Sequence, residues 1–217
     1  RAFDHDFMGE QVYQQPFTVV VCAADKVPPA HESEKALGRH LDGCRIGFDL
    51  GASDLKVSAV IDGEPVFSTE IVWEPRQNTD PAYHYERILS ALQLAASKLP
   101  RVDAIGGSSA GVYVDNRPMI ASLFRGVSAE RYGEVRSLFA RIRQAMGGTP
   151  LEVINDGEVT ALAGSMSLED DSILGVAMGS SEAAGYVTPT GSLTGWLNEL
   201  AFAPVDYQPD APADEWS

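Results

Sequence analysis

Three runs of alternating apolar and polar residues near the start of the sequence predict neighbouring β-strands. Arg45 to Leu50 and Leu55 to Ile61 each alternate, and Pro65 to Trp73 follows after Asp62-Gly63, a strong two-residue turn signal. Consecutive strands joined by short turns pair antiparallel. We therefore expect a three-stranded meander that forms the first half of a sheet.

Two later segments place apolar residues at helical spacing. Asp80-Pro81 supplies an N-cap acid and a proline at the first helical position, and Pro100 ends this segment. The second segment runs from Ser128 to Met146 and is ended by Gly147-Gly148, with Gly133 expected to kink its start. Both segments are predicted helices that cover the sheet.

Short apolar runs between the helical segments predict buried strands. We expect strands at Val102 to Ile105, Leu151 to Ile154, Ile173 to Met178 and Tyr186 to Thr188, a hairpin or loop over Val112 to Met119, a helix over Gly157 to Met166, and a further strand at Phe17 to Ala24. Strands that alternate with helices indicate an α/β fold.

Composition limits the classes of function. The chain has 217 residues, of which 44% are hydrophobic and 22% charged, with a formal net charge of -15. This is typical of a globular protein with one large or two small domains, and the acidity argues against nucleic acid or an anionic membrane as partner. The sequence shows no signal peptide and no apolar span of membrane length.

The two cysteines, Cys22 and Cys44, lack the spacing of a zinc site and support no disulfide framework, so we expect a cytoplasmic protein. Because the sequence begins with Arg1 rather than Met, we expect a processed product or part of a longer polypeptide.

The turn between the first two strands is a candidate phosphate site. Gly51, Ala52 and Ser53 carry little or no side chain, so a ligand can approach the backbone N–H groups. Asp49, at the end of its strand, has the chemistry to hold a hydrated magnesium ion. A tight β-hairpin with small turn residues is the alternative interpretation.

The segment Gly107-Ser108-Ser109-Ala110-Gly111 is a G-x-S-x-G sequence, which in a hydrolase presents the serine as a nucleophile. All four histidines precede Ser109, so a catalytic triad with the chain order Ser, acid, His is excluded. A Ser-Asp dyad of Ser109 with Asp156 is still compatible with the sequence. The elbow of such enzymes needs a helix after the serine, whereas Val112 to Pro118 is β-like. Val112 also replaces the lysine of a Walker A motif.

Asn155-Asp156 follows a predicted buried strand and precedes a predicted helix. A carboxylate at a strand end can accept a hydroxyl proton while the neighbouring amide positions the same substrate, which makes Asp156 a candidate general base. The alternative is that Asp156 only caps the helix. A phosphoryl transferase without a P-loop would need two turns that bind phosphate and a base that faces the substrate alcohol. Two small-residue turns, with an Asn-Asp pair at a strand end between them in sequence, meet that need.

Five ordered segments resemble motifs of one known family. They are Phe48 to Lys56 (first phosphate motif, usually D-x-G-G-T), Ile105 to Gly126 (a strand and P-G-x-V-D loop with substrate-lining residues), Val153 to Ala163 (N-D-A-N-A-A-A-L), Gly179 to Tyr186 (second phosphate motif, G-T-G-I-G-G-G) and Asn198 to Phe202 (G-E-I-G-H). Together they are similar to the ROK family (repressors, open reading frames and kinases) of the actin-like ATPase and sugar kinase superfamily.

The resemblance implies an α/β fold of the actin-like ATPase (ribonuclease H-like) class, with a mixed sheet flanked by helices and an incomplete second lobe. It implies four segments: an N-terminal extension of unassigned function (1–43), the N-terminal lobe (44–168), the start of the second lobe (169–207) and an acidic tail or linker (208–217). Either a homo-oligomer or a further segment is expected to complete the second lobe.

It also implies ATP-dependent phosphorylation of a sugar hydroxyl. The implied residues are Asp156 as catalytic base, Asn155, Glu199, Ser109 and Ala110 around the sugar, Asp49 for Mg²⁺ through water, and Asp49, Gly51, Ala52, Ser53, Lys56, Gly179 and Ser180 for the ATP phosphates.

Departures from the family motifs favour a second hypothesis, a degenerate sugar-binding or regulatory protein without kinase activity. Ser181 to Ala184 replace most of the glycines of the second phosphate motif, and Glu182 would repel polyphosphate unless it turns outward. Phe202 stands where the family has a histidine, and the cysteine-rich motif that would follow is absent, so no zinc is expected. A Ser-Asp hydrolase that uses Ser109 is the third hypothesis.

Overall fold

The fold is described from a computed structural model, which covers residues 3–179, 181–203, 208 and 210–211. Ser180 and most of the acidic tail predicted at 208–217 therefore lie outside the described residues.

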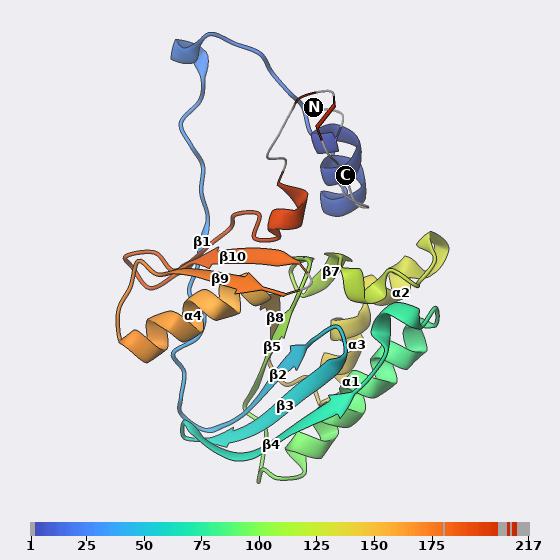
Figure 1. Ribbon diagram of the computed structural model, residues 1–217. Coiled ribbons are helices and arrows are strands. Elements are labelled where there is room, and N and C mark those ends of the chain that lie inside the picture. Colours follow the sequence, from blue (N-terminus) through green and yellow to red (C-terminus); the bar gives the residue numbers. More distant parts are fainter. Residues whose placement is uncertain (1–2, 180, 204–207, 209, 212–217) are drawn as a thin grey trace.

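A five-stranded mixed sheet forms the centre of the chain (Figure 1), in the order β4-β3-β2-β5-β8. Its strands are β2 (Cys44–Leu50), β3 (Asp54–Ile61), β4 (Glu64–Val72), β5 (Ala104–Ser109) and β8 (Leu151–Asn155). β2, β3 and β4 pair antiparallel, whereas β5 pairs parallel with β2 and β8 pairs parallel with β5. The predicted meander and the mixed α/β sheet are confirmed.

Helices cover one face of this sheet. They are α1 (Pro81–Ala96), α2 (Tyr132–Arg136) and α3 (Leu138–Ala145). In β2 every second side chain is buried, and Ile46, Phe48 and Leu50 pack with Ile88 and Phe139 of the helices in one core. Asp80 caps α1 by accepting a hydrogen bond from the N–H of Ala82 at 3.1 Å, as the sequence predicts.

A hairpin connects β5 to the helices. It consists of β6 (Val112–Val114) and β7 (Arg117–Ile120), joined by Asp115 and Asn116, which both have positive φ as a tight hairpin turn requires. The side chain of Asn116 accepts a hydrogen bond from the N–H of Val153 at 2.6 Å. The turn thus satisfies part of the backbone on the outer edge of β8.

A second layer consists of α4 (Asp156–Leu168) and the two-stranded antiparallel sheet of β9 (Leu174–Met178) and β10 (Glu182–Tyr186), which lies against it (Figure 1). The strands and the helix are in close contact. A Cβ on Gly175 would lie 2.3 Å from the N of Ala161, and one on Gly185 would lie 2.4 Å from the Cα of Glu158. Only glycine permits this approach of strand to helix.

The N-terminal region contacts both layers. η1 (Phe3–Tyr13), a π-helix, shares a small apolar cluster with Val112, Met119 and Phe202. The short strand β1 (Glu34–Lys35) pairs antiparallel with β11 (Leu193–Thr194), and Arg39 forms an ion pair with Asp171. The remaining short elements are η2 (Ala24–Lys26), η3 (Pro75–Gln77), η4 (Ser122–Phe124), η5 (Ala129–Arg131) and η6 (Leu200–Phe202).

Four local predictions are wrong. Phe17–Ala24 is exposed and pairs with none of the described strands. The strand predicted at Val102 to Ile105 is Ala104–Ser109, and its end pairs with β2 and β8 on both sides. The returning strand is Glu182–Tyr186 rather than Tyr186 to Thr188. The second helical segment breaks at Ser137, and Gly133 lies within α2.

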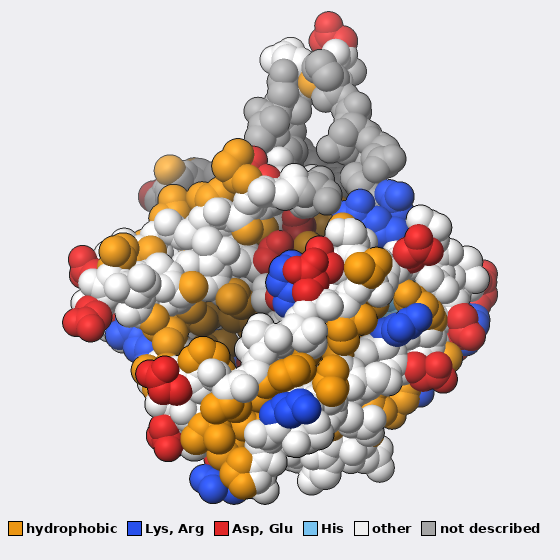
Figure 2. Space-filling view, turned by 60° about the horizontal axis from the view of Figure 1, so that its bottom comes forward, with side chains coloured by type: hydrophobic (Ala, Val, Ile, Leu, Met, Phe, Trp, Pro, Cys, Tyr) orange, Lys and Arg blue, Asp and Glu red, His pale blue; other side chains and the backbone are white. Residues whose placement is uncertain are grey.

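On the face in Figure 2, hydrophobic side chains line the hollow at its centre.

Among the described residues, no helix combines the length and apolar character that crossing a membrane requires.

Two adjacent glycines of β5 provide a test of this packing. A Cβ at Gly107 would lie 2.1 Å from Cζ of the buried Phe48, whereas a Cβ at Gly106 meets nothing within 4 Å. We expect Gly107→Ala to lower the free energy of unfolding by about 1–3 kcal/mol. Gly106→Ala, the matched control, should change it by less than about 1 kcal/mol, towards greater stability. Urea unfolding measures both, and equal effects would contradict the described register.

Candidate active site

The carboxyl ends of three parallel strands place the predicted site residues at one edge of the sheet. Leu50 of β2 lies beside Ser109 of β5, which lies beside Asn155 of β8. Asp49 and Asp156 therefore flank the end of β5 from its two sides. In open α/β sheets, ligands bind at this end of parallel strands.

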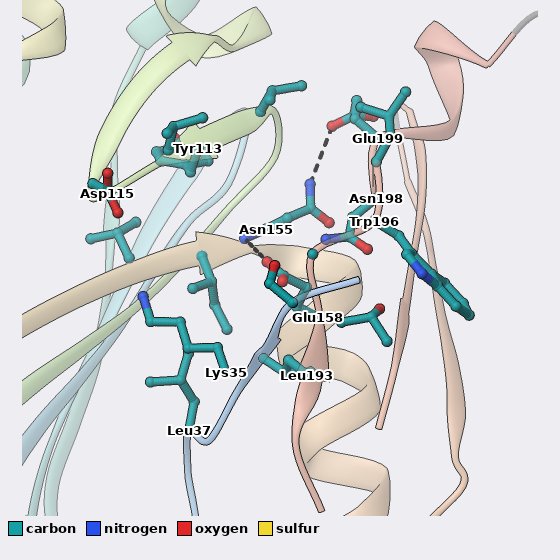
Figure 3. Close-up of a pocket in the computed structure, with 18 of the residues that line it drawn as sticks. Lys35, Leu37, Tyr113, Asp115, Asn155, Glu158, Leu193, Trp196, Asn198 and Glu199 are labelled. Carbon is teal, nitrogen blue, oxygen red and sulfur yellow. Dashed lines mark hydrogen bonds between the residues drawn. The ribbon is translucent and has the colours of Figure 1, made fainter. Parts of the chain in front are cut away.

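Glu199 lies at the centre of a buried hydrogen-bond network (Figure 3). The residue is 4% exposed, and its Oε2 accepts from the N–H of Gly111 at 2.7 Å and from Nδ2 of Asn155 at 3.5 Å. Nδ2 of Asn155 also donates to the carbonyl of Gly111 at 2.9 Å, and the Ser181 hydroxyl donates to Glu199 Oε1. The structure thus brings together Asn155 and Glu199, which are 44 residues apart in sequence.

Gly111 adopts a backbone conformation that this network needs. Its φ is +120°, and a Cβ there would lie 2.4 Å from the carbonyl oxygen of Ile120. The last glycine of the G-x-S-x-G sequence therefore serves to present an N–H to Glu199 and a carbonyl to Asn155.

Asn155, not Asp156, is the main cap of α4. The Asn155 side chain accepts from the N–H of Gly157 at 2.8 Å, and Glu158 accepts from the N–H of Asn155 at 3.0 Å, which completes a capping box. Asp156 Oδ1 also accepts from the N–H of Gly157, at 3.1 Å. Because Asn155 caps the helix, the carboxyl of Asp156 is not required as the cap and can have another role.

Burial raises the pKa of Asp156 to about 6, and the charges of Glu199 and Asp49 add to this rise. A carboxyl with a raised pKa close to neutrality is suited to exchange a proton with a substrate hydroxyl. The same interactions indicate that the three carboxylates form one electrostatic group.

Ser109 does not have the surroundings of a nucleophile. It is fully buried, its Oγ accepts from the hydroxyl of Tyr113 at 2.7 Å, and it is followed by the β6–β7 hairpin instead of a helix. Burial raises the pKa of Tyr113, which therefore stays a neutral donor. The elbow that the hydrolase hypothesis needs is absent from this segment. Ala110 lies between Ser109 and Gly111, at the edge of the Glu199 network.

The first small-residue turn is held together by its own backbone. The N–H of Gly51 donates to the carbonyl of Asp54 at 2.9 Å, and Nε1 of Trp73 donates to the carbonyl of Gly51 at 2.9 Å. Ala52 is half-buried and Ser53 exposed. Lys56, predicted to bind phosphate, forms an ion pair with Asp54.

The second turn is shorter than predicted. Gly179 donates its N–H to the carbonyl of Ser181 at 3.0 Å, and Glu182 already belongs to β10 with its side chain exposed. Phe202 packs on Phe7 with ring centroids 5.6 Å apart.

A cavity of about 430 Å³ adjoins the Glu199 network. We call it the β8-edge cavity because it lies between the outer edge of β8, the β6–β7 hairpin, β1 and β11 (Figure 3). Asn155 and Glu199 line it, as do residues that the sequence analysis missed: Lys35, Glu158, Thr194, Trp196 and Asn198. No sequence signal identifies β1 as a wall of this cavity, because β1 pairs with a strand more than 150 residues away.

Magnesium and ATP are the groups that the family resemblance implies. Asp49 is half-buried and close enough to Asp156 to influence its pKa, and a single carboxylate is a common protein ligand of hydrated Mg²⁺. This donor fits such an ion. The described residues contain no group of three or more His, Cys, Asp or Glu that could hold a metal ion directly.

No protein-family model matches the sequence, and no curated protein matches it. Solved structures do match. The chain superposes on a ROK family transcriptional regulator that is a homolog of the E. coli MLC protein with a TM-score of 0.60 and 22% identity, over 81% of this chain and 44% of the regulator. It superposes on the ROK hexokinase from Thermus thermophilus with a TM-score of 0.58 and 17% identity, over 80% of this chain and 56% of the hexokinase.

The chain shares the fold of these ROK structures. The Lmo2764 protein of Listeria monocytogenes, a proposed N-acetylmannosamine kinase, also matches, with a TM-score of 0.51 and 20% identity over 69% of this chain and 48% of that protein. The predicted resemblance and the α/β actin-like ATPase class are thereby confirmed for the fold. The chain spans about half the length of the ROK structures it matches.

The raised pKa of Asp156 predicts a pH-dependent effect on stability. The folded-state pKa of about 6 lies above the ordinary value of 3.8, so ionisation of Asp156 destabilises the fold as the pH rises between these values. Asp156→Asn should therefore be more stable than the wild type by about 1 kcal/mol at about pH 7.5, and this gain should vanish near pH 4. Urea unfolding at both pH values measures the gain. Asp25→Asn, at an exposed position, is the control and should show no such gain.

Glu199→Gln should lower the pKa of Asp156, because Gln keeps an acceptor for the N–H of Gly111 but removes the negative charge. The pKa should remain above the ordinary value of 3.8, since burial is the larger cause of the shift. Carbon NMR titration of the Asp156 carboxyl measures this change. An unchanged pKa would show that Glu199 does not act on Asp156.

Proposed function

We propose that this chain carries the sugar-binding and proton-accepting part of an ATP-dependent sugar kinase of ROK type. The observation that supports this most is the Asp156 carboxyl, which has a pKa raised to about 6 and lies at the carboxyl end of the parallel strands next to Asn155 and Glu199. A general base needs its pKa near the working pH and a substrate held within hydrogen-bond reach.

In the proposed reaction, Asp156 accepts the proton of the sugar hydroxyl that attacks the γ-phosphoryl group. Asn155 and Glu199 hold neighbouring hydroxyls, and their mutual hydrogen bond fixes both side chains before the sugar binds. Ser109, which pairs with Asn155 at the neighbouring strand end, and Ala110, which follows it, support this wall. When bound, Mg-ATP supplies the phosphoryl group and neutralises its developing charge.

The proposed ligands of Mg-ATP are Asp49 for the hydrated ion, and Gly51, Ala52, Ser53, Lys56, Gly179 and Ser180 for the phosphates. The exposed position of Glu182 supports this assignment, because its side chain lies in solvent and is not buried within the second turn. Lys56 would have to exchange its ion pair with Asp54 for a phosphate.

A sugar-responsive protein without phosphoryl transfer is the second candidate function. The ion pair of Lys56 and the short second turn favour it, and a ROK transcriptional regulator shares this fold. Both candidates retain sugar binding at Asn155 and Glu199, and they differ in whether ATP is consumed.

We also propose that a further segment or a second subunit completes the layer that β9 begins. Among the described strands, β9 pairs with β10 alone, and its side chains Leu174, Val176 and Met178 are exposed. An unpaired strand edge with apolar side chains is typically covered in the native assembly. The cytoplasm remains the proposed location.

Asp156→Asn tests the kinase proposal. We expect this variant to lose 10²- to 10⁴-fold or more in the rate of sugar-dependent ATP consumption, because the amide cannot accept the hydroxyl proton, while sugar affinity changes little. A coupled assay for ADP over a panel of sugars measures the rate, and calorimetry measures the affinity.

Asp25→Asn, which removes a carboxylate from the exposed η2 segment, is the matched control and should keep the wild-type rate. If the wild-type protein consumes ATP with no sugar of the panel but binds one of them, the sugar-responsive candidate replaces the kinase.

A further inference from the structure

Trp73 lies outside the residues assigned to the proposed reaction, yet it contacts the first small-residue turn. This turn consists of Gly51, Ala52 and Ser53 between β2 and β3, and Trp73 directly follows β4. The role inferred for Trp73 rests on the proposed binding of the ATP phosphates at this turn.

Two hydrogen bonds from Trp73 hold the carbonyl groups at the two ends of the turn. Its indole Nε1–H donates to the carbonyl of Gly51 at 2.9 Å, and its backbone N–H donates to the carbonyl of Ser53 at 3.1 Å. Carbonyl oxygens carry partial negative charge and would repel phosphate oxygens. Trp73 thus engages the groups of the turn that would oppose an anion.

The bond to Gly51 also sets the direction of the next N–H group. The carbonyl of Gly51 and the N–H of Ala52 belong to one trans peptide plane, in which they point in opposite directions. Because Trp73 packs in the core beneath the helices, the N–H of Ala52 is directed away from that core. Asp49 occupies a position between the core residues of β2, so it lies on the same side, away from the helices.

The turn has backbone donors that its own structure does not use. The N–H of Gly51 donates to the carbonyl of Asp54 at 2.9 Å, whereas the N–H groups of Ala52 and Ser53 donate to no acceptor among the described residues. Successive N–H groups of this kind in a turn form a concave site for an anion. The unused donors are therefore the ones that a phosphate would bind.

The position of Trp73 is itself fixed. The residue is 2% exposed, and its ring lies edge-on to that of His84, with centroids 6.2 Å apart and an interplanar angle of 78°. Nε2 of His84 donates to the carbonyl of Pro75 at 3.0 Å, and the hydroxyl of Tyr83 accepts from the N–H of Glu74 at 3.0 Å. Helix α1 thus holds the segment after β4 at two points, so the indole donor is in place before a ligand binds.

We propose that Trp73 is a positioning residue for ATP binding. It holds the carbonyls of Gly51 and Ser53 on the core side of the turn, so that the N–H groups of Ala52 and Ser53 are presented to the phosphates. Trp73 does not contact the nucleotide and acts only through the conformation of the turn.

Trp73→Phe tests this role, because it keeps an aromatic ring in the core but removes the indole N–H. We expect the affinity for the Mg²⁺ complex of AMP-PNP, a non-hydrolysable ATP analogue, to fall about tenfold. The KM for ATP should rise by a similar factor with a smaller change in kcat, and the affinity for a sugar that the wild type binds should not change. Calorimetry measures both affinities.

Nitrogen-15 NMR of the wild type is a second measurement that needs no variant. When the Mg²⁺ complex of AMP-PNP is added, the backbone amide signals of Ala52 and Ser53 should shift, together with the indole Nε1–H signal of Trp73. In Trp73→Phe the two amide shifts at saturation should be smaller, because the Gly51 carbonyl has lost its donor.

Ile142→Val, which removes a methyl group from the same core in α3, is the matched control for lost packing and should keep the nucleotide affinity of the wild type. Three outcomes would each overturn the proposal: unchanged nucleotide affinity in Trp73→Phe, an equal loss in Ile142→Val, or a wild type in which AMP-PNP does not shift the amides of Ala52 and Ser53. Failure here is distinguishable from failure of the kinase proposal. A wild type that consumes ATP with a sugar, together with a Trp73→Phe variant that binds AMP-PNP equally well, would refute only the role of Trp73.

Discussion

The buried carboxylate of Glu199 is the interaction on which the site depends. It joins three parts of the chain: Gly111 after β5, Asn155 at the junction of β8 and α4, and Ser181 before β10. A carboxylate removed from water is unfavourable unless donors surround it, so these segments must adopt positions that supply their donors. Burial, and after it the same charge, raises the pKa of Asp156. One residue therefore holds the geometry of the strand ends and contributes to the protonation behaviour of the carboxyl beside them.

Much of the fold follows from local sequence, because the elements concerned are strongly patterned. The alternation in β2 and β3, the turn at Asp62-Gly63 and the cap of α1 at Asp80 each have a local physical cause, and the structure confirms them. Phe17–Ala24 shows the limit of this reasoning. Its apolar run has the composition of a strand, but a strand forms only where a partner edge is available.

The candidate site could be predicted in part. Asn155 and Asp156 stand out because they follow a buried strand, and parallel strands bring such ends together. Glu199 was indicated by family resemblance alone, since nothing near it in sequence shows that its partners are Gly111 and Asn155. The sequence analysis missed Lys35 and Thr194 because each belongs to a two-residue strand, which is too short to show a periodic pattern.

The pairing of β1 with β11 has a consequence for the order of folding. Glu34 pairs with Thr194, so this contact closes a loop of about three quarters of the chain, whereas β2, β3 and β4 pair with strands adjacent in sequence. Contacts between distant residues cost more chain entropy when they form. Here few neighbouring contacts compensate for that cost. We therefore expect the central sheet to form first and the wall contributed by β1 to dock last, so that the chain acquires its core before it acquires a complete binding cavity.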